Sequence, residues 1–157
     1  GVDPPVRQDA PDELNLIVEG GFYGHPSVFG DELAHDVVGE PGRPALPPAA
    51  LFPAHASADG LLAYRGRRFG KLRGLLLAAE FGSYLYSAQQ SGRRLVLIAP
   101  PPPGRLDPSV SVAALVDPFP GRPLDLVEGP DGRIQVADFE GGKVWVIDRV
   151  DTYPPQR

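Results

Sequence analysis

Apolar residues in the middle of the chain come in short runs rather than at helical spacing. The runs occupy residues 61–64, 75–79, 84–86 and 95–98, and glycine, serine or arginine residues separate them. Their lengths are typical of β-strands, and none is long enough to predict a helix. We therefore expect residues 59–98 to form a unit of short antiparallel strands.

A second set of apolar runs follows four consecutive prolines, Pro100 to Pro103. These runs occupy residues 113–116, 124–127, 134–137 and 144–147. The sequence Gly129-Pro130-Asp131-Gly132 predicts a tight turn between two of them, because proline presets one corner of a turn and glycine tolerates a positive φ. The proline run cannot join a strand ladder, so we expect an extended connector followed by an antiparallel meander.

The first half of the chain has less regular spacing. Residues 27–58 hold few periodic apolar positions and include a proline-rich stretch from Pro41 to Pro53, which predicts a long excursion loop. We interpret the chain as one all-β domain. Its expected parts are an opening loop (11–26), the excursion loop (27–58), a first strand unit (59–98), a connector (99–112), a closing strand unit (113–149) and a tail (150–157).

Two segments of the chain resemble each other at an offset of 58 residues. Gly-Leu-Leu-Leu-Ala-Ala-Glu-Phe at 74–81 matches Gly-Arg-Ile-Gln-Val-Ala-Asp-Phe at 132–139, and we align 83–86 with 143–146 after them. A repeat of this size made of short strands is typical of β-propeller blades. Chance similarity between two meanders is the alternative.

Composition narrows the classes of function. The chain has 157 residues, is 42% hydrophobic and carries a net charge of -5, which fits one globular domain. The arginines are scattered and the charge is negative, so we expect no nucleic-acid partner. The chain has no cysteine, which excludes disulfides, thiolate metal sites and a cysteine nucleophile. No apolar run approaches the roughly 20 residues that span a bilayer, and the lack of any methionine suggests a piece of a longer product.

The segment from Pro11 to Pro26 has the acid-to-aromatic spacing of a cation-holding loop. It reads Pro-Asp-Glu-Leu-Asn-Leu-Ile-Val-Glu-Gly-Gly-Phe-Tyr-Gly-His-Pro. It is followed by Asp-Gly-Leu-Leu-Ala-Tyr at 59–64 and by Gly-Arg-Pro-Leu-Asp at 121–125. Together with the turn at 129–132, these motifs resemble the C-terminal part of the glucose/sorbosone dehydrogenase family. That resemblance runs from about Pro11 to about Arg149, and it implies the C-terminal blades of a six-bladed β-propeller, with 59–98 and 113–149 as blades.

The resemblance implies a calcium ion at the opening motif. Glu13 matches the family glutamate and Tyr23 matches the tyrosine whose main chain holds the ion. Ca²⁺ takes carboxylate and carbonyl oxygens in a flexible shell, and the glycines of the motif let the backbone turn its carbonyls inward. Taken without the resemblance, Glu13 is a solvated turn acid and Tyr23 packs at the edge of a sheet.

The resemblance also implies a pyrroloquinoline quinone cofactor that oxidises the anomeric carbon of an aldose. Arginine suits the carboxylates of this cofactor because its planar fork binds them in bidentate fashion. Arg122 matches the first arginine of the family's Arg-x-Arg-Asp motif, whereas Leu124 replaces the second arginine. Phe81 stands where the family has a lysine.

No residue of this chain is assigned a catalytic role. The family's catalytic histidine lies in an earlier blade, and none of His25, His35 and His55 matches it. His35 lies among acids, which is conceivable for a metal site but more typical of a solvated loop. His55 falls near the implied channel mouth, where a turn-capping role is the alternative to a ligand contact.

Two functions follow from these observations. The chain is expected to be a C-terminal fragment of a quinone-dependent sugar dehydrogenase, with a sugar substrate. The alternative is a non-catalytic propeller that binds a protein partner, as hedgehog-interacting proteins of the same family do. The absence of basic side chains at Phe81 and Leu124 favours this alternative. The family implies an extracellular or periplasmic location. Because two blades alone leave strand edges open, we expect the isolated chain to associate or to be marginally stable.

Overall fold

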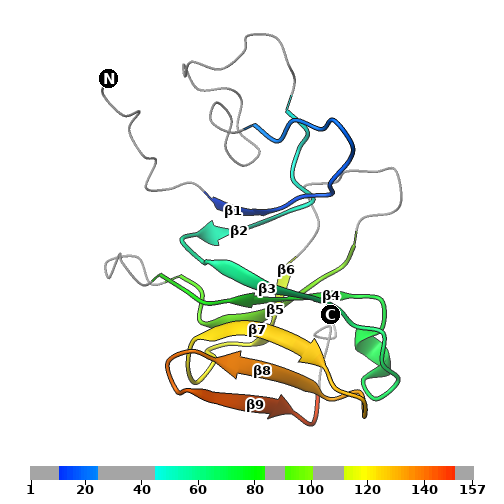
Figure 1. The fold of residues 1–157 in the computed structure, drawn as a ribbon, viewed down its shortest axis with the longest axis vertical. Helices are drawn as coiled ribbons and strands as arrows, with labels where there is room; N and C mark the ends of the chain where they lie inside the picture. Colours follow the sequence, from blue (N-terminus) through cyan, green and yellow to red (C-terminus); the bar gives the residue numbers. More distant parts are fainter. Residues whose placement is uncertain (1–10, 25–44, 84–90, 101–111, 151–157) are drawn as a thin grey trace, which may run out of the picture.

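The computed structural model describes residues 11–24, 45–83, 91–100 and 112–150. In these ranges the regular structure consists of nine β-strands and one short 3-10 helix, with no α-helix (Figure 1). The expected all-β class is therefore confirmed. No helix in the described ranges is long and apolar enough to cross a membrane.

The strands form three antiparallel sheets in chain order. The opening sheet contains β1 (Pro11–Leu14) and β2 (Ala50–Ala54). The central sheet contains β3 (Ala58–Ala63), β4 (Leu76–Glu80), β5 (Arg94–Ile98) and β6 (Val112–Val116), with the 3-10 helix η1 (Gly70–Leu72) between β3 and β4. The closing sheet contains β7 (Pro123–Glu128), β8 (Ile134–Asp138) and β9 (Lys143–Ile147).

Three strands differ from the sequence prediction. β1 opens the expected loop 11–26, and β2 lies inside the expected loop 27–58. β2 forms because Ala50 and Phe52 alternate into the core, with exposed fractions of 0% and 3%. β6 lies in the range assigned to the closing unit, yet it pairs with β5 of the central sheet. The proline-rich sequence between β5 and β6 does not indicate that these two strands pair.

The two middle strands of the central sheet, β4 and β5, are buried on both faces because they contribute to two apolar clusters. Figure 1 shows the central sheet between the opening and closing sheets. Along β5, Leu95 and Leu97 pack toward the closing sheet, whereas Val96 and Ile98 pack with the opening sheet. A strand that is covered on both sides has no solvent face. This explains why β4 and β5 are continuous apolar runs in the sequence.

The central and closing sheets approach closely at their first strands. A Cβ atom at Gly60 of β3 would lie 2.8 Å from the Cα of Asp125 in β7, so this position requires glycine. The buried Tyr64 hydroxyl donates a hydrogen bond to the Gly132 carbonyl at 2.7 Å. Leu126 and Ile134 add apolar contacts from the closing sheet. These contacts make the two sheets one packed unit.

The internal repeat reappears in the geometry of these two sheets. β4 and β8 keep the offset of 58 residues, and each is the second strand of its sheet. Each first strand has an irregular register opposite the acid that ends the second strand, Glu80 or Asp138. The third strands of the two sheets are β5 and β9, whereas the sequence alignment pairs 143–146 with 83–86. Residues 84–86 lie outside the described part of the chain.

Candidate functional site

The described part of the opening loop folds back on itself after β1. The Gly21 amide donates to the Val18 carbonyl at 3.0 Å, and Gly20 between them has a φ of 69°, which suits glycine at this turn. The Tyr23 hydroxyl donates to the Leu16 carbonyl at 3.0 Å and accepts from the Val18 amide at 2.6 Å. The tyrosine side chain therefore closes the loop.

Both ends of this loop are tied to the segment that precedes β2. The Ala49 amide donates to the Leu14 carbonyl at 2.7 Å, and the Leu46 amide donates to the Phe22 carbonyl at 2.7 Å. Glu13 lies opposite Leu51 in the β1–β2 ladder. The loop is thus fixed by main-chain bonds at its two ends and by Tyr23 in its middle.

The oxygen atoms near Glu13 match the chemistry of a hard cation. The half-buried Glu13 carboxylate accepts a hydrogen bond from the Asn15 Nδ2 at 3.0 Å. The Asn15 Oδ1 is buried and has no hydrogen-bond partner. The described residues contain no group of three or more His, Cys, Asp or Glu side chains placed to hold a metal. A cation at this loop would therefore depend on amide and carbonyl oxygens besides Glu13, which Ca²⁺ accepts.

Arg122, the expected cofactor contact, joins the closing sheet to the central sheet. Its Nη1 donates to the carbonyls of Phe81, Gly82 and Ser83 at 3.5, 3.4 and 3.3 Å. Its guanidinium also lies 5.2 Å from the centre of the Phe81 ring, a cation–π distance. The three bonds are long and individually weak. The three bonds and the Phe81 ring together hold the Arg122 side chain between the end of the central sheet and the end of the closing sheet.

The buried Asp138 organises the main chain beside Arg122. Its carboxylate accepts from the Arg122 amide at 3.0 Å, from the Gly141 amide at 3.0 Å and from the Trp145 Nε1 at 2.9 Å. The Trp145 bond is the largest cause that lowers the pKa of Asp138 to about 2, and the two amides add to it against the effect of burial. A side chain at Gly121 would collide with this carboxylate.

Glu80 holds the matching place in the central sheet but has a different partner. It is fully buried, and its carboxylate accepts two hydrogen bonds from the Arg94 guanidinium, at 2.6 and 3.0 Å. These bonds raise the pKa of Arg94 above its usual value, while burial opposes the rise. Arg94 opens β5 directly opposite Glu80 in the ladder.

Segments far apart in the sequence meet at this end of the sheets. The amides of Phe81 and Gly82 donate to the carbonyls of Ser57 and Ala56, at 2.8 and 2.7 Å. The Arg93 Nε donates to the Gly121 carbonyl at 3.1 Å. No pattern in the sequence singles out Arg93, because only the fold brings it next to Arg122.

Three non-glycine residues at this end have left-handed backbones. They are His55, Ser57 and Arg93, with φ values of 60°, 50° and 56°. Such conformations store strain and concentrate at functional sites.

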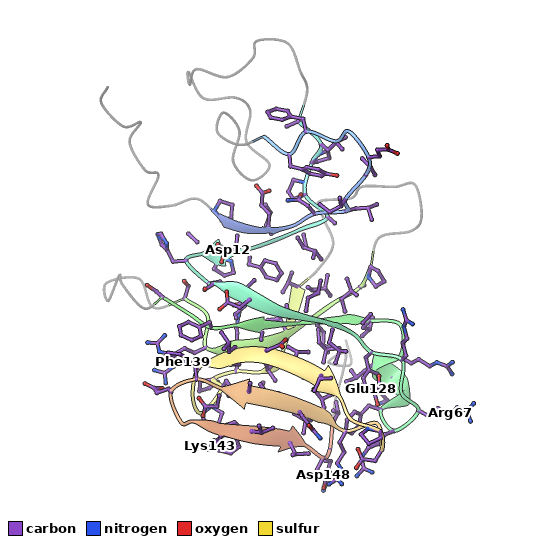
Figure 2. The ribbon with its side chains drawn as sticks, in the orientation of Figure 1. Asp12, Arg67, Glu128, Phe139, Lys143 and Asp148 are labelled. Carbon is purple, nitrogen blue, oxygen red and sulfur yellow. The ribbon has the colours of Figure 1, made fainter. Side chains whose placement is uncertain are left out.

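Phe81 and Phe139, which occupy matching places in the repeat, meet at this end of the sheets with ring centres 5.5 Å apart. Figure 2 places Phe139 at the same end as Asp12 and Lys143.

The other expected site residues do not gather in one place. Leu124 is 40% exposed on β7, and Glu13 and Tyr23 belong to the opening loop, whereas Arg122 is at the sheet ends. His25 and His35 lie outside the described residues. Comparison of the chain with protein-family models, curated proteins and solved structures gave no match.

Proposed function

We propose that this chain is the C-terminal part of a β-propeller of the glucose/sorbosone dehydrogenase type. In this proposal the complete protein oxidises an aldose or a related sugar with pyrroloquinoline quinone. The observation that carries it is the pair of stacked antiparallel sheets with matching second strands, β4 and β8, each ending in a buried acid. Blades of a propeller are meanders of this kind arranged side by side.

Calcium has a defined place in this proposal. Glu13 and the main chain of Tyr23 would hold the ion in the opening loop, as the resemblance implies. The buried, unpaired Asn15 Oδ1 beside the Glu13 carboxylate supports a cation there. The ion would brace the loop against the opening sheet, because its ligands come from both sides of the turn at Gly20.

The residues of this chain do not fit the quinone by themselves. The Nη1 of Arg122 is directed at three main-chain carbonyls, and Phe81 and Leu124 offer no positive charge. The nearby Arg93 is paired with Glu140 at 2.6 Å. We therefore assign no step of sugar oxidation to these residues, and the redox chemistry belongs to the complete protein.

A non-catalytic, protein-binding propeller is the second candidate. Two observations favour it. The Arg122 side chain is bonded to main-chain carbonyls, and apolar side chains are exposed on the closing sheet. Val127, Val144 and Val146 are 55%, 62% and 47% exposed. Exposed apolar residues that lie together on one face are typical of surfaces that bind proteins.

Quinone binding by the complete protein separates the two candidates. The protein is loaded with Ca²⁺, titrated with pyrroloquinoline quinone, and followed by the absorbance of the quinone before and after an aldose is added. We expect saturable uptake and reduction of the quinone by the sugar. Arg122→Ala tests whether this guanidinium contacts a quinone carboxylate in addition to the main-chain carbonyls. Such a contact would make uptake by the variant about tenfold weaker or more, because a charge-assisted hydrogen bond contributes about 1.5 to 3 kcal/mol.

Arg133→Ala is the matched control for this experiment. Arg133 pairs with Asp131 within an exposed turn of the closing sheet, so its loss should leave quinone uptake unchanged. No uptake by the complete protein would reject the dehydrogenase and leave the protein-binding propeller.

A further inference from the structure

Asn15 has an unsatisfied oxygen inside the opening loop. Its Nδ2 donates to the Glu13 carboxylate, whereas its Oδ1 is the one buried side-chain polar atom without a hydrogen-bond partner in the part of the chain that the structure describes. Leaving a buried acceptor unpaired costs free energy, and folded proteins rarely tolerate it without a bound water or ion. Some partner of the Asn15 oxygen is therefore expected.

The orientation of the Asn15 amide follows from chemistry. The oxygen and nitrogen of an amide are assigned from their hydrogen bonds. An ionised carboxylate only accepts hydrogen bonds, so the amide nitrogen must face Glu13. The unpaired atom is then the oxygen, and its missing partner is a hydrogen-bond donor or a cation.

The surrounding charge favours a cation. Asn15 follows Glu13 by two residues, the spacing that places side chains on one face of an extended chain. The ranges 11–24 and 45–59 contain four acids and neither a lysine nor an arginine; the acids are Asp12, Glu13, Glu19 and Asp59. No lysine or arginine of these two segments competes for the Asn15 oxygen.

We propose that the Asn15 Oδ1 coordinates Ca²⁺ together with the Glu13 carboxylate. The inference rests on the calcium ion of the proposed function and adds a third ligand residue to Glu13 and Tyr23. The hydrogen bond from the Asn15 Nδ2 to Glu13 then has a second role, because it orients both oxygen ligands. Carboxylate, side-chain amide and main-chain oxygens together form a typical Ca²⁺ shell.

Calcium titration of the purified chain, followed by calorimetry and thermal melts, tests this assignment. We expect Ca²⁺ to raise the melting temperature of the wild type. Asn15→Leu keeps a similar volume but removes the oxygen, so it should weaken Ca²⁺ binding at least tenfold and lose most of the shift. In EDTA, the same variant should melt close to the wild-type temperature, because losing the unpaired buried oxygen offsets losing the hydrogen bond from the Asn15 Nδ2 to Glu13.

Further variants and a control complete the experiment. Asn15→Asp retains an oxygen ligand and should keep the Ca²⁺ shift. If Asn15→Leu does not fold, Asn15→Ala removes the same oxygen with a smaller side chain and should lose the shift. Glu13→Gln should lose the shift. Gln135→Leu removes an amide from the closing sheet and should leave Ca²⁺ binding unchanged.

The outcomes distinguish this inference from the proposed function. If Glu13→Gln loses Ca²⁺ binding and Asn15→Leu does not, Asn15 is no ligand although the calcium loop stands. If the wild type shows no Ca²⁺ response, a buried water satisfies Asn15 and the calcium part of the proposed function fails with it. Quinone uptake by the complete protein is measured separately and tests the dehydrogenase itself.

Discussion

The acids that end β4 and β8 occupy matching places but are stabilised by different partners. Glu80 relies on one guanidinium, that of Arg94, whereas Asp138 relies on main-chain amides and the Trp145 ring nitrogen. In the sequence both acids belong to a repeat. Their burial is not visible there, because an acid after an apolar run is equally typical of a solvated strand end.

Removing Arg94 should destabilise the fold strongly. Arg94→Met keeps the aliphatic part of the side chain and leaves the fully buried Glu80 carboxylate without its partner. Breaking a buried ion pair in this way costs about 3 to 5 kcal/mol. Urea unfolding of the purified chain at neutral pH measures the loss in the free energy of unfolding.

A double variant and a surface pair serve as controls for Arg94. Glu80→Gln combined with Arg94→Met should recover part of the loss, because no buried charge remains. Arg133→Met breaks the exposed pair with Asp131 and should cost less than about 1 kcal/mol. Equal losses for Arg133→Met and Arg94→Met would contradict the importance of burial.

Asp138 should make stability depend on pH in the acid range. Its pKa of about 2 in the folded chain lies below the unfolded value of about 3.9. The ionised form is therefore favoured by folding, and its contribution is complete above the unfolded pKa and lost as the pH falls through the folded pKa. Asp138→Asn should melt below the wild type at pH 7, and the difference should narrow between about pH 4 and pH 2.

Asp131 provides the matched comparison for this titration. Its pKa is also lowered, first by the Arg133 amide and then by the Arg133 side chain, but it lies on an exposed turn. Asp131→Asn should change the acid dependence of the melting temperature less than Asp138→Asn does. If the difference between the wild type and Asp138→Asn stays constant down to about pH 2, the assigned pKa of Asp138 is wrong.

At the scale of elements, glycines allow the segments before β5 and after β4 to touch. Gly92 has a φ of 81°, and a side chain there would collide with the main chains of Gly82 and Ala56. Gly92→Ala should therefore destabilise the chain by more than the roughly 1 kcal/mol associated with an unfavourable backbone conformation alone. Denaturant unfolding measures this loss.

A substitution at Gly142 provides a control that separates the steric cost of a side chain from the cost of a positive φ. It has a φ of 58°, but nothing lies within 4 Å of a Cβ placed there. Gly142→Ala should carry only the backbone cost and destabilise the chain less than Gly92→Ala. The reverse order would show that the contact at Gly92 relaxes without penalty.

The sequence predicts strands better than it predicts their partners. β4, β5, β8 and β9 stand out because their apolar runs are bounded by turn residues, and the repeat links β4 to β8. The sequence places β6 in the wrong sheet, because strand pairing across a long connector depends on the packed fold. The same limit applies to the site: the motif predicts Glu13 and Tyr23 in one loop, whereas the unpaired oxygen of Asn15 and the contacts of Arg122 require coordinates.

At the scale of the whole molecule, the repeat relates the outer face of the closing sheet to a face of the central sheet that is buried. Arg94 opens β5 opposite Glu80, and Lys143 opens β9 opposite Asp138. Counted from these matching positions, Val144 and Val146 of β9 correspond to Leu95 and Leu97 of β5. The two leucines are 1% and 0% exposed because the closing sheet covers them. In the closing sheet the corresponding face is open.

We expect this open face to drive self-association of the isolated chain. Val144→Lys combined with Val146→Lys should raise the dissociation constant at least tenfold, since about 25 cal/mol of hydrophobic free energy is lost for each Å² of apolar surface that can no longer be buried. Ile17→Lys changes a residue that is 75% exposed on the opening loop and should not affect association. Sedimentation velocity over a range of concentrations gives the oligomeric state. A wild-type chain that stays monomeric and melts cooperatively at high temperature would show that the closing sheet needs no cover, because its exposed valines are then compatible with a stable single copy.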